Sequence, residues 1–265
     1  MQGIQILNLS CTYSSLQELA VSKSQIDHVE KITQGQRINP HWLMYRKGRL
    51  KASNFGVVIK RINPHWLMYR KGRLTASNFG VVIKAVNRNS YPPSLFKRLL
   101  GEYDLSRVMS VQWGIDHEDE AADTYVSHMS QYGIDSVEEC GIYLDNTGTL
   151  GASPDRLVGS HGLLEIKCLY TQRNSTVESG LGSKDFPLSC DANGRITLKE
   201  NHDYYHQVQG QLYLSGRTTC TVAFWTPANM LLVPVTKDPA WAPKLHLLRN
   251  FYQNQLLPKM INGGL

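Results

Sequence analysis

The chain has 265 residues, 42% of them hydrophobic, so it is long enough to bury a sizeable core in one main domain. Lys and Arg outnumber Asp and Glu by 28 to 22, and the resulting net charge of +6 favours a polyanionic partner without identifying it. The five cysteines include no C-x-x-C pair, so neither a disulfide framework nor a thiolate zinc site is indicated. No apolar run approaches the roughly 20 residues of a membrane span, and no secretion signal is recognisable. We therefore expect a soluble, intracellular protein in the nucleus or cytoplasm, with no membrane partner.

A 24-residue tandem repeat dominates the N-terminal third of the chain. Arg37–Lys60 is followed at once by Arg61–Lys84, and the two copies differ only at Lys51 and Thr75. Solenoid repeats need three or more units to bury a shared core, and they are rarely so nearly identical. A recent duplication, such as a doubled exon or an assembly artefact, is therefore the expected origin. A fold built around one copy must loop out the other.

Each copy is predicted to form two helices separated by a basic turn. The first helix begins at the Asn-Pro pair and ends at Lys-Gly, and the second opens at the Thr75-Ala-Ser-Asn segment in the second copy. The turn is either solvated or a phosphate site, in which arginines, hydroxyls and helix N-terminal amides converge on an anion. Its charged residues are Arg46, Lys47 and Arg49 in the first copy and Arg70, Lys71 and Arg73 in the second.

The hydrophobic pattern elsewhere predicts further helices and strands, with residues 1–24 expected to be poorly ordered. Helices are predicted at 24–36, 106–129, 202–215 and 241–257, and strands at 136–144, 149–158, 163–170, 218–225 and 230–236. A proline-containing linker is predicted at 87–94, and residues 171–201 are predicted to be loop-like, forming either a mobile flap or a small hairpin at 195–198. Short turns between the first three strands predict an antiparallel meander. This order indicates an α/β (α+β) fold, with a mixed β-sheet flanked by α-helices.

Three charged residues interrupt strands that otherwise look buried. Ser153 and Asp155 share a face of the strand at 149–158, and Glu165 and Lys167 share a face of the next strand. If these strands pair, the three charges converge, and carboxylates from two strands are ligands that Mg²⁺ or Mn²⁺ prefers. Lys167 would then orient a water or stabilise developing charge, because a role as base would require a strongly lowered pKa. A surface hairpin with a salt bridge is the alternative.

Another acidic residue falls on the apolar stripe of the helix predicted at 106–129. Glu118 comes seven residues after Val111 and seven before Tyr125. Lone acidic residues are seldom fully buried. This carboxylate is therefore either needed inside the protein or placed at the edge of the stripe, where it reaches water.

Five segments in one order carry a resemblance to a known family: RLTAS at 73–77, WGIDHE at 113–118, GASPD at 151–155, LEIKC at 164–168 and HQVQG at 206–210. Over residues 25–257 they resemble the YqaJ-like viral recombinase family, which includes the phage lambda exonuclease, within the PD-(D/E)XK nuclease superfamily. The resemblance implies a restriction-endonuclease-like core in a single nuclease domain at 25–260, with the duplication at 37–84 inside it. It also implies a Mg²⁺- or Mn²⁺-dependent exonuclease that acts on double-stranded DNA ends, 5′ to 3′ in the phage enzymes, in recombination or repair. A homo-oligomer, a trimer in the phage family, is a further implication.

The same resemblance implies roles for individual residues. Asp155 and Glu165 would hold the metal together with the backbone carbonyl of Ile166, while Lys167 would serve the attacking water. Glu118 matches an additional acidic residue beside the metal, and Gln207 would line the site. The catalytic set implied in this way is Glu118, Asp155, Glu165, Lys167 and Gln207.

A pocket for the DNA 5′-phosphate is implied upstream of this set. Arg70, Ser77 and Ser153 match positions that hold the terminal phosphate in the phage enzyme, although by themselves they also suit an exposed arginine, a helix N-cap and a strand-end hydroxyl. The first copy offers Arg46 and Ser53 for the same pocket. We favour the second copy because it leads directly into the catalytic half.

Two departures from the family leave other functions open. Residues 181–193 look extra relative to the phage enzyme, and the duplication could misplace the upstream helix. A catalytically weak DNA-binding domain, disabled by the duplication, is therefore one alternative. A structural module within a larger multidomain protein is another.

Overall fold

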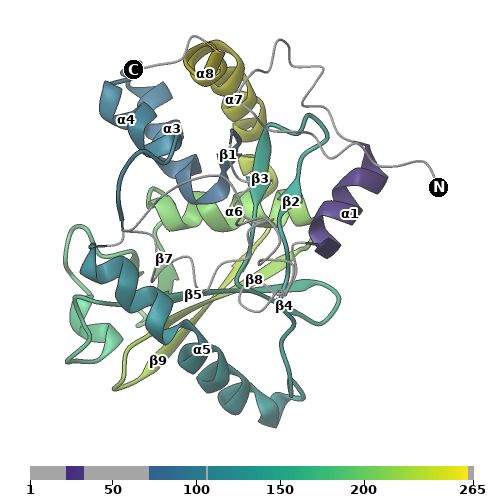
Figure 1. Cartoon of the computed structure of the whole chain (residues 1–265). Helices are drawn as coiled ribbons and strands as arrows, with labels where there is room; N and C mark the ends of the chain where they lie inside the picture. Colours follow the sequence, from purple (N-terminus) through teal and green to yellow (C-terminus); the bar gives the residue numbers. More distant parts are fainter. Residues whose placement is uncertain (1–21, 33–71, 106, 262–265) are drawn as a thin grey trace.

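The structure is a computed structural model that describes residues 22–32, 72–105 and 107–261 (Figure 1). Helix α1 (Lys23–Ile32) begins one residue before the helix predicted at 24–36 and covers its first nine residues. The first repeat copy, including Arg46 and Ser53, lies outside the described residues, and so does Arg70. The expected disorder of residues 1–24 concerns a segment that is almost entirely outside them as well.

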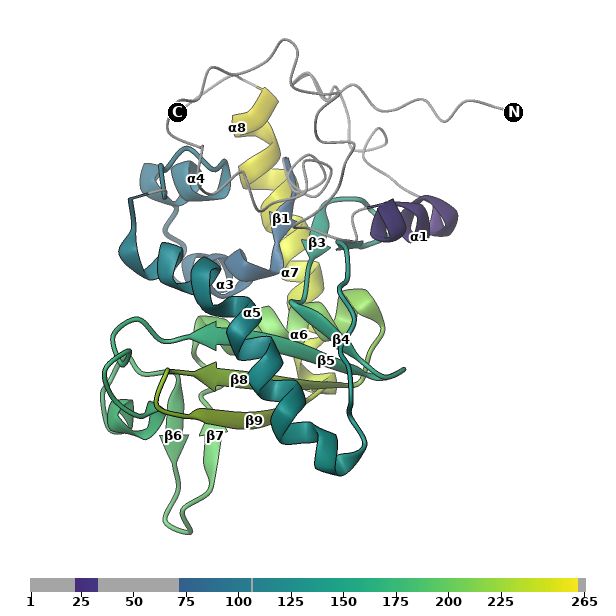
Figure 2. The same cartoon turned by 60° about the horizontal axis from the view of Figure 1, so that its bottom comes forward.

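A four-stranded mixed sheet forms the centre of the protein, in the order β4-β5-β8-β9. Its strands are β4 (Arg156–Val158), β5 (Gly162–Cys168), β8 (Thr219–Trp225) and β9 (Met230–Thr236). Strands β5 and β8 are parallel, with Glu165 opposite Val222, whereas β4 and β9 run antiparallel to their neighbours. Helix α5 (Met109–Met129) covers one face and α6 (Asp203–Ser215) the other (Figure 2). This confirms the predicted mixed sheet flanked by helices.

Alternation along β5 and β8 explains why both faces are covered. Leu164 and Ile166 pack toward Ala122 and Tyr125 of α5, whereas Leu163 packs toward α6. Because each large apolar side chain contributes about 1.5–3 kcal/mol when fully buried, both faces drive the association of a helix. The other residues that face α6 from the sheet are Val222, Phe224 and Val233, which meet Val208 and Leu212.

The second repeat copy supplies part of a second, smaller sheet and the helix after it. This sheet has the order β1-β3-β2, with β1 (Leu74–Thr75) parallel to β3 (Leu150–Ala152) and β2 (Tyr143–Leu144) antiparallel to it. The chain then forms the 3₁₀ turn η4 (Ala76–Asn78) and helix α3 (Phe79–Asn87). Leu74 and Phe79 are fully buried, so this end of the second copy is core.

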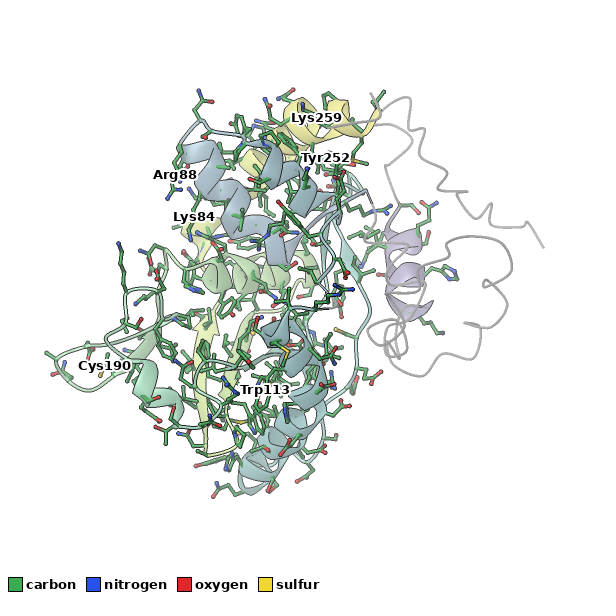
Figure 3. The ribbon with its side chains drawn as sticks, turned by 60° about the vertical axis from the view of Figure 1, so that its left-hand side comes forward. Lys84, Arg88, Trp113, Cys190, Tyr252 and Lys259 are labelled. Atoms are coloured by element: carbon green, nitrogen blue, oxygen red, sulfur yellow. The ribbon has the colours of Figure 1, made fainter. Side chains whose placement is uncertain are left out.

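Arg73, predicted to belong to the basic turn, is instead buried. It is 5% exposed, and its Nε donates to the carbonyl of Gly148 at 2.7 Å. The buried Tyr252, whose side chain is labelled in Figure 3, donates to the carbonyl of Gly72, the residue before Arg73, at 2.5 Å. The hydrogen bond to a main-chain carbonyl gives the buried guanidinium of Arg73 a partner. The sequence pattern did not indicate this burial. Arg73 therefore belongs to the packing of the second copy rather than to a solvated turn.

The predicted meander is wrong, because the strand expected at 149–158 is divided between the two sheets. Strand β3 ends at Ala152 and β4 begins at Arg156. Pro154, between them, has no N–H to donate to a ladder, and its carbonyl accepts a hydrogen bond from Cys140 Sγ at 3.0 Å. The strand predicted at 136–144 is likewise reduced to β2 and a single bridge between Glu138 and Leu157.

The remaining elements surround this core. Helix α4 (Pro93–Leu99) occupies the end of the predicted linker, with its proline at the first helical position. The hairpin predicted near 195–198 is confirmed as β6 (Leu188–Cys190) paired with β7 (Ile196–Leu198). Among the residues described, no helix is both long and apolar enough to cross a bilayer. The other segments are η5 (Ser130–Tyr132), η6 (Val177–Gly180), η7 (Pro239–Trp241), α7 (Pro243–Phe251), the π-helical turn η8 (Tyr252–Leu256) and α8 (Leu257–Ile261).

Candidate active site

Glu165 is the centre of a buried polar network between β5 and α6. It is 2% exposed, and its Oε1 accepts hydrogen bonds from Lys167 Nζ at 2.6 Å and from Gln207 Nε2 at 2.5 Å. Lys167 also donates to Gln207 Oε1 at 3.3 Å. Two residues apart on β5, Glu165 and Lys167 face the same way, as alternation predicts. The structure thus brings together three of the predicted site residues.

Asp155 reaches this network from the break between β3 and β4. Its Oδ2 accepts the backbone N–H of Ile166 at 2.7 Å, so the side chain takes the place of a strand partner at the edge of β5. Asp155 was expected on a continuous strand. Instead β3 ends at Ala152 and β4 begins at Arg156, so Asp155 follows Pro154 in the break between them. Burial raises the pKa of Asp155 well above its usual value, and the negative charges of Glu165 and Glu118 raise it further. This carboxylate is therefore destabilised in its charged form as the site stands.

Glu118 lies on α5, and its negative charge acts on Asp155. Its Oε1 is 3.2 Å from Arg156 Nη1, and Arg156 Nη2 is 3.0 Å from Asp119 on the same helix. Arg156 also donates to the carbonyl of Asp155 at 2.7 Å, so it ties α5 to the start of β4. Glu118 is 28% exposed and belongs to the edge of the helix stripe. Sequence reasoning missed Arg156, whose position beside Asp155 was the available signal.

Lys167 carries a positive charge into the site. Burial disfavours its ammonium, but the negative charge of Glu165, with Tyr204 and Asp155, outweighs that effect and raises the pKa of Lys167. The ammonium also lies 4.6 Å from the ring centre of Tyr204. A raised pKa opposes a role as general base and suits orientation and charge stabilisation.

Gln211 is a member of the network that the sequence reasoning did not assign to the site. Its Nε2 donates to Glu165 Oε2 at 2.6 Å, and the side chain is 1% exposed. The available signal was its spacing, because a residue four positions after Gln207 lies on the same helix face.

The predicted phosphate-pocket residues are placed only in part. Strands β1 and β3 are parallel with Thr75 opposite Gly151, and Ser77 and Ser153 each follow two residues later. The Ser77 hydroxyl is 3.2 Å from that of Thr75, and the Ser153 hydroxyl donates to the carbonyl of Gly141 at 3.3 Å. Both serines therefore follow the carboxyl ends of neighbouring strands.

The donor set suits a small, hard divalent cation. Asp155 and Glu165 offer carboxylate oxygens and Ile166 a backbone carbonyl, the ligand types that Mg²⁺ and Mn²⁺ select. Burial, and after it the negative charges of Glu165 and Glu118, raises the pKa of Asp155, and a bound cation would offset both effects. Within the described part of the chain, no three acidic, His or Cys side chains already stand in metal-holding proximity. Glu118 is engaged by Arg156, so the fit rests on Asp155, Glu165 and the Ile166 carbonyl.

Comparisons with known proteins agree with this architecture. Residues 65–218, more than half of the chain, match the model of the YqaJ-like viral recombinase domain. The alkaline nuclease of Autographa californica nuclear polyhedrosis virus is 25% identical over 247 residues, covering 86% of this chain and 51% of that protein. The chain thus spans about half the length of this relative.

Solved structures show the same fold. The alkaline exonuclease LHK-Exo from Laribacter hongkongensis is similar with a TM-score of 0.55 and 25% identity, covering 75% of this chain and 94% of the other. The complex of LHK-Exo with dAMP is similar with a TM-score of 0.55 and 26% identity, over the same shares of the two chains. The fold is restriction-endonuclease-like, as predicted.

Proposed function

The chain belongs to the YqaJ-like viral recombinase domain family, and from that premise we propose that it is a Mg²⁺- or Mn²⁺-dependent DNA exonuclease. The observation that carries this proposal is the convergence of Asp155, Glu165 and Lys167 at one sheet edge, with Gln207 hydrogen-bonded to the last two. Two buried carboxylates of like charge are costly unless something compensates them. A pure binding module has no need of such an arrangement.

Each residue has a role that follows from its contacts. Asp155, Glu165 and the Ile166 carbonyl would hold the cation, which when bound supplies Lewis-acid charge to the scissile phosphate and lowers the pKa of a nearby water. Lys167, charged and held between Glu165 and Gln207, orients that water and offsets negative charge that develops on the phosphate. Gln207 fixes the direction of the ammonium.

Duplex DNA ends and 5′ to 3′ polarity are the proposed substrate and direction. The support is the resemblance to the phage enzymes, together with the placement of Ser77 and Ser153 at the ends of adjacent parallel strands, where two hydroxyls can meet a terminal phosphate. LHK-Exo binds dAMP in a solved complex, which fits a nucleotide product. The homologous viral protein is an alkaline nuclease.

The test uses the purified full chain with linear duplex DNA labelled at either end, and with a covalently closed circle as a control. We expect nucleotide release from the linear DNA only, with Mg²⁺ and not with EDTA, and the 5′ label to be released first. Asp155→Ala and Lys167→Ala should each abolish release. Release that persists in either variant would sink the site assignment, whereas binding without degradation would indicate a DNA-binding domain.

A further inference from the structure

Gln211 links two parts of the proposed active site through one amide group. Its Nε2 lies 2.6 Å from Glu165 Oε2 on β5 and 3.5 Å from the carbonyl of Ser153, in the break that leads to Asp155. Glu165 Oε1 is already held by Lys167 and Gln207, and of the residues that the structure describes only Gln211 hydrogen-bonds to the second oxygen. The orientation of the carboxylate therefore depends on Gln211.

The other end of the same side chain is unsatisfied. Among the described residues, no group hydrogen-bonds to the buried Oε1 of Gln211. An unpaired buried acceptor lowers the stability of the fold and calls for an explanation. The amide cannot turn over to satisfy it, because Oε1 would then face the Glu165 carboxylate. Contact with Glu165 thus holds Gln211 in an orientation that packing by itself would disfavour.

Gln209 provides a contrast on the same helix. It is 0% exposed, and its Nε2 donates to the carbonyl of Thr236 at 2.9 Å while its Oε1 accepts the N–H of Asp238 at 2.9 Å. Both ends of this amide are paired with backbone groups far from Glu165. A buried glutamine that serves only the fold is satisfied in this way, and Gln211 is not.

We propose that Gln211 is a positioning residue that orients Glu165 for the divalent cation and couples it to the Ser153–Asp155 segment. This inference rests on the proposed function, since it assigns Glu165 to that cation. The residue acts through Glu165 and is not itself a ligand. Partners behind a metal ligand typically contribute about 10–100-fold to metal affinity or activity.

The test measures Mn²⁺ binding directly by titration calorimetry of the full chain, with Asp155→Ala as the blank for the site. Gln211→Met keeps the length of the side chain and removes the amide, and Gln209→Met is the matched control on the same helix. We expect Gln211→Met to weaken Mn²⁺ binding by about 10-fold or more, while Gln209→Met lowers the melting temperature and leaves the Mn²⁺ affinity within about twofold. In nuclease assays, Gln211→Met should raise the Mn²⁺ concentration needed for half-maximal rate by a similar factor.

Gln211→Asn is the second variant should the methionine variant fail to fold, because its shorter amide no longer reaches Glu165 Oε2. The same loss of Mn²⁺ affinity is expected. If the wild-type chain binds Mn²⁺ and the Gln211 variants bind it as tightly as Gln209→Met, the positioning role is overturned. A wild-type chain that binds no Mn²⁺ overturns the metal site of the proposed function itself.

Discussion

Asp145 is a buried carboxylate and Asp155, ten residues later, a partly buried one, and they are compensated in different ways. Asp145 is 2% exposed, pairs with Arg249 at 2.8 Å and accepts the N–H groups of Thr149 and Leu150 at 3.0 Å each. Asp155 accepts a single N–H, from Ile166, and faces the charges of two further carboxylates. The first site is balanced within the protein, whereas the second carries excess negative charge.

The difference separates a charge that serves the fold from one to which the proposed function gives a chemical role. Around Asp145, ion pairing and main-chain donors lock the turn that joins β2 to β3. Around Asp155, Lys167 and the Ile166 N–H only partly offset burial and the repulsion from Glu165 and Glu118, so that the pKa of Asp155 stays raised. This is the pattern expected where binding of a cation supplies the remaining compensation. Variants at the two positions should therefore change stability in opposite directions.

The largest effect is expected from Asp145→Ala, which leaves Arg249 without its partner and several turn donors unpaired. Breaking a buried pair costs about 3–5 kcal/mol, so the free energy of unfolding in urea should fall by that order. Asp119→Ala is the control, because this carboxylate also contacts an arginine but is 61% exposed, and it should change stability by less than about 1 kcal/mol. If Asp145→Ala and Asp119→Ala lost equal free energy of unfolding, Asp145 would not have the structural role assigned to it.

Asp155→Asn should lower nuclease activity strongly without lowering stability, the reverse of what is expected at Asp145. Because losing even a group behind a metal ligand costs about 10–100-fold, replacing a ligand should lower nuclease activity more than about 100-fold. The amide oxygen can still accept the Ile166 N–H, and the repulsion from Glu165 and Glu118 disappears. Stability measured in EDTA should therefore be equal to or greater than that of the wild type. Destabilisation as large as that of Asp145→Ala would show that Asp155 is structural.

Thr75→Lys sharpens the comparison by adding a charge to the core. The change places the residue of the first repeat copy into the second, at a position that is 5% exposed between the buried Leu74 and Ala76. Overpacking typically costs about 1–3 kcal/mol, and here an ammonium is buried as well, so we expect about 2–3 kcal/mol from urea unfolding. Thr75→Ser keeps the hydroxyl and should lose less. If Thr75→Lys left the free energy of unfolding unchanged, β1 could accept the residue of either repeat copy at this position.

The smallest effect concerns His206, whose ring nitrogen accepts the indole N–H of Trp241 at 3.0 Å. Burial lowers the pKa of His206 to about 4; Asp203 opposes this, and Lys84 and Lys244 add to it. A lowered folded-state pKa gives stability that is present above about pH 6.5 and is lost as the pH falls toward 4. After discounting for its partial exposure, the loss should be about 1 kcal/mol. His206→Gln should show a smaller difference in urea stability between pH 7.5 and pH 5; an equal difference would contradict this assignment.

The sequence predicted the elements whose pattern is local. Alternation placed Glu165 and Lys167 on one face, and the stripe on α5 left two places open for Glu118, of which the structure has the edge. The strands at β5, β8 and β9 and the helix at α6 lie within one or two residues of their predicted bounds. Each of these follows from a period that a few neighbouring residues define.

What the sequence did not predict depends on contacts between distant segments. The change of sheet at Pro154 was not foreseen, because a proline within an apolar run does not say which sheet the next strand joins. The contacts of Arg156 with Glu118 and of Gln211 with Glu165 form only once α5 and α6 are packed on the two faces of the sheet. The burial of Arg73 likewise depends on a turn 75 residues further along the chain.

The parallel pairing of β5 with β8 also determines when the site can form during synthesis. The strand that carries Glu165 and Lys167 needs residues 219–225 as its neighbour, and the two glutamines come from a helix that ends only at Ser215. Pairing across so long a loop is slow, because the entropy of closing it must be lost before the contacts are gained. A nascent chain released before Trp225 therefore holds both carboxylates without the frame that aligns them. Nuclease activity should emerge only after nearly the whole domain has left the ribosome.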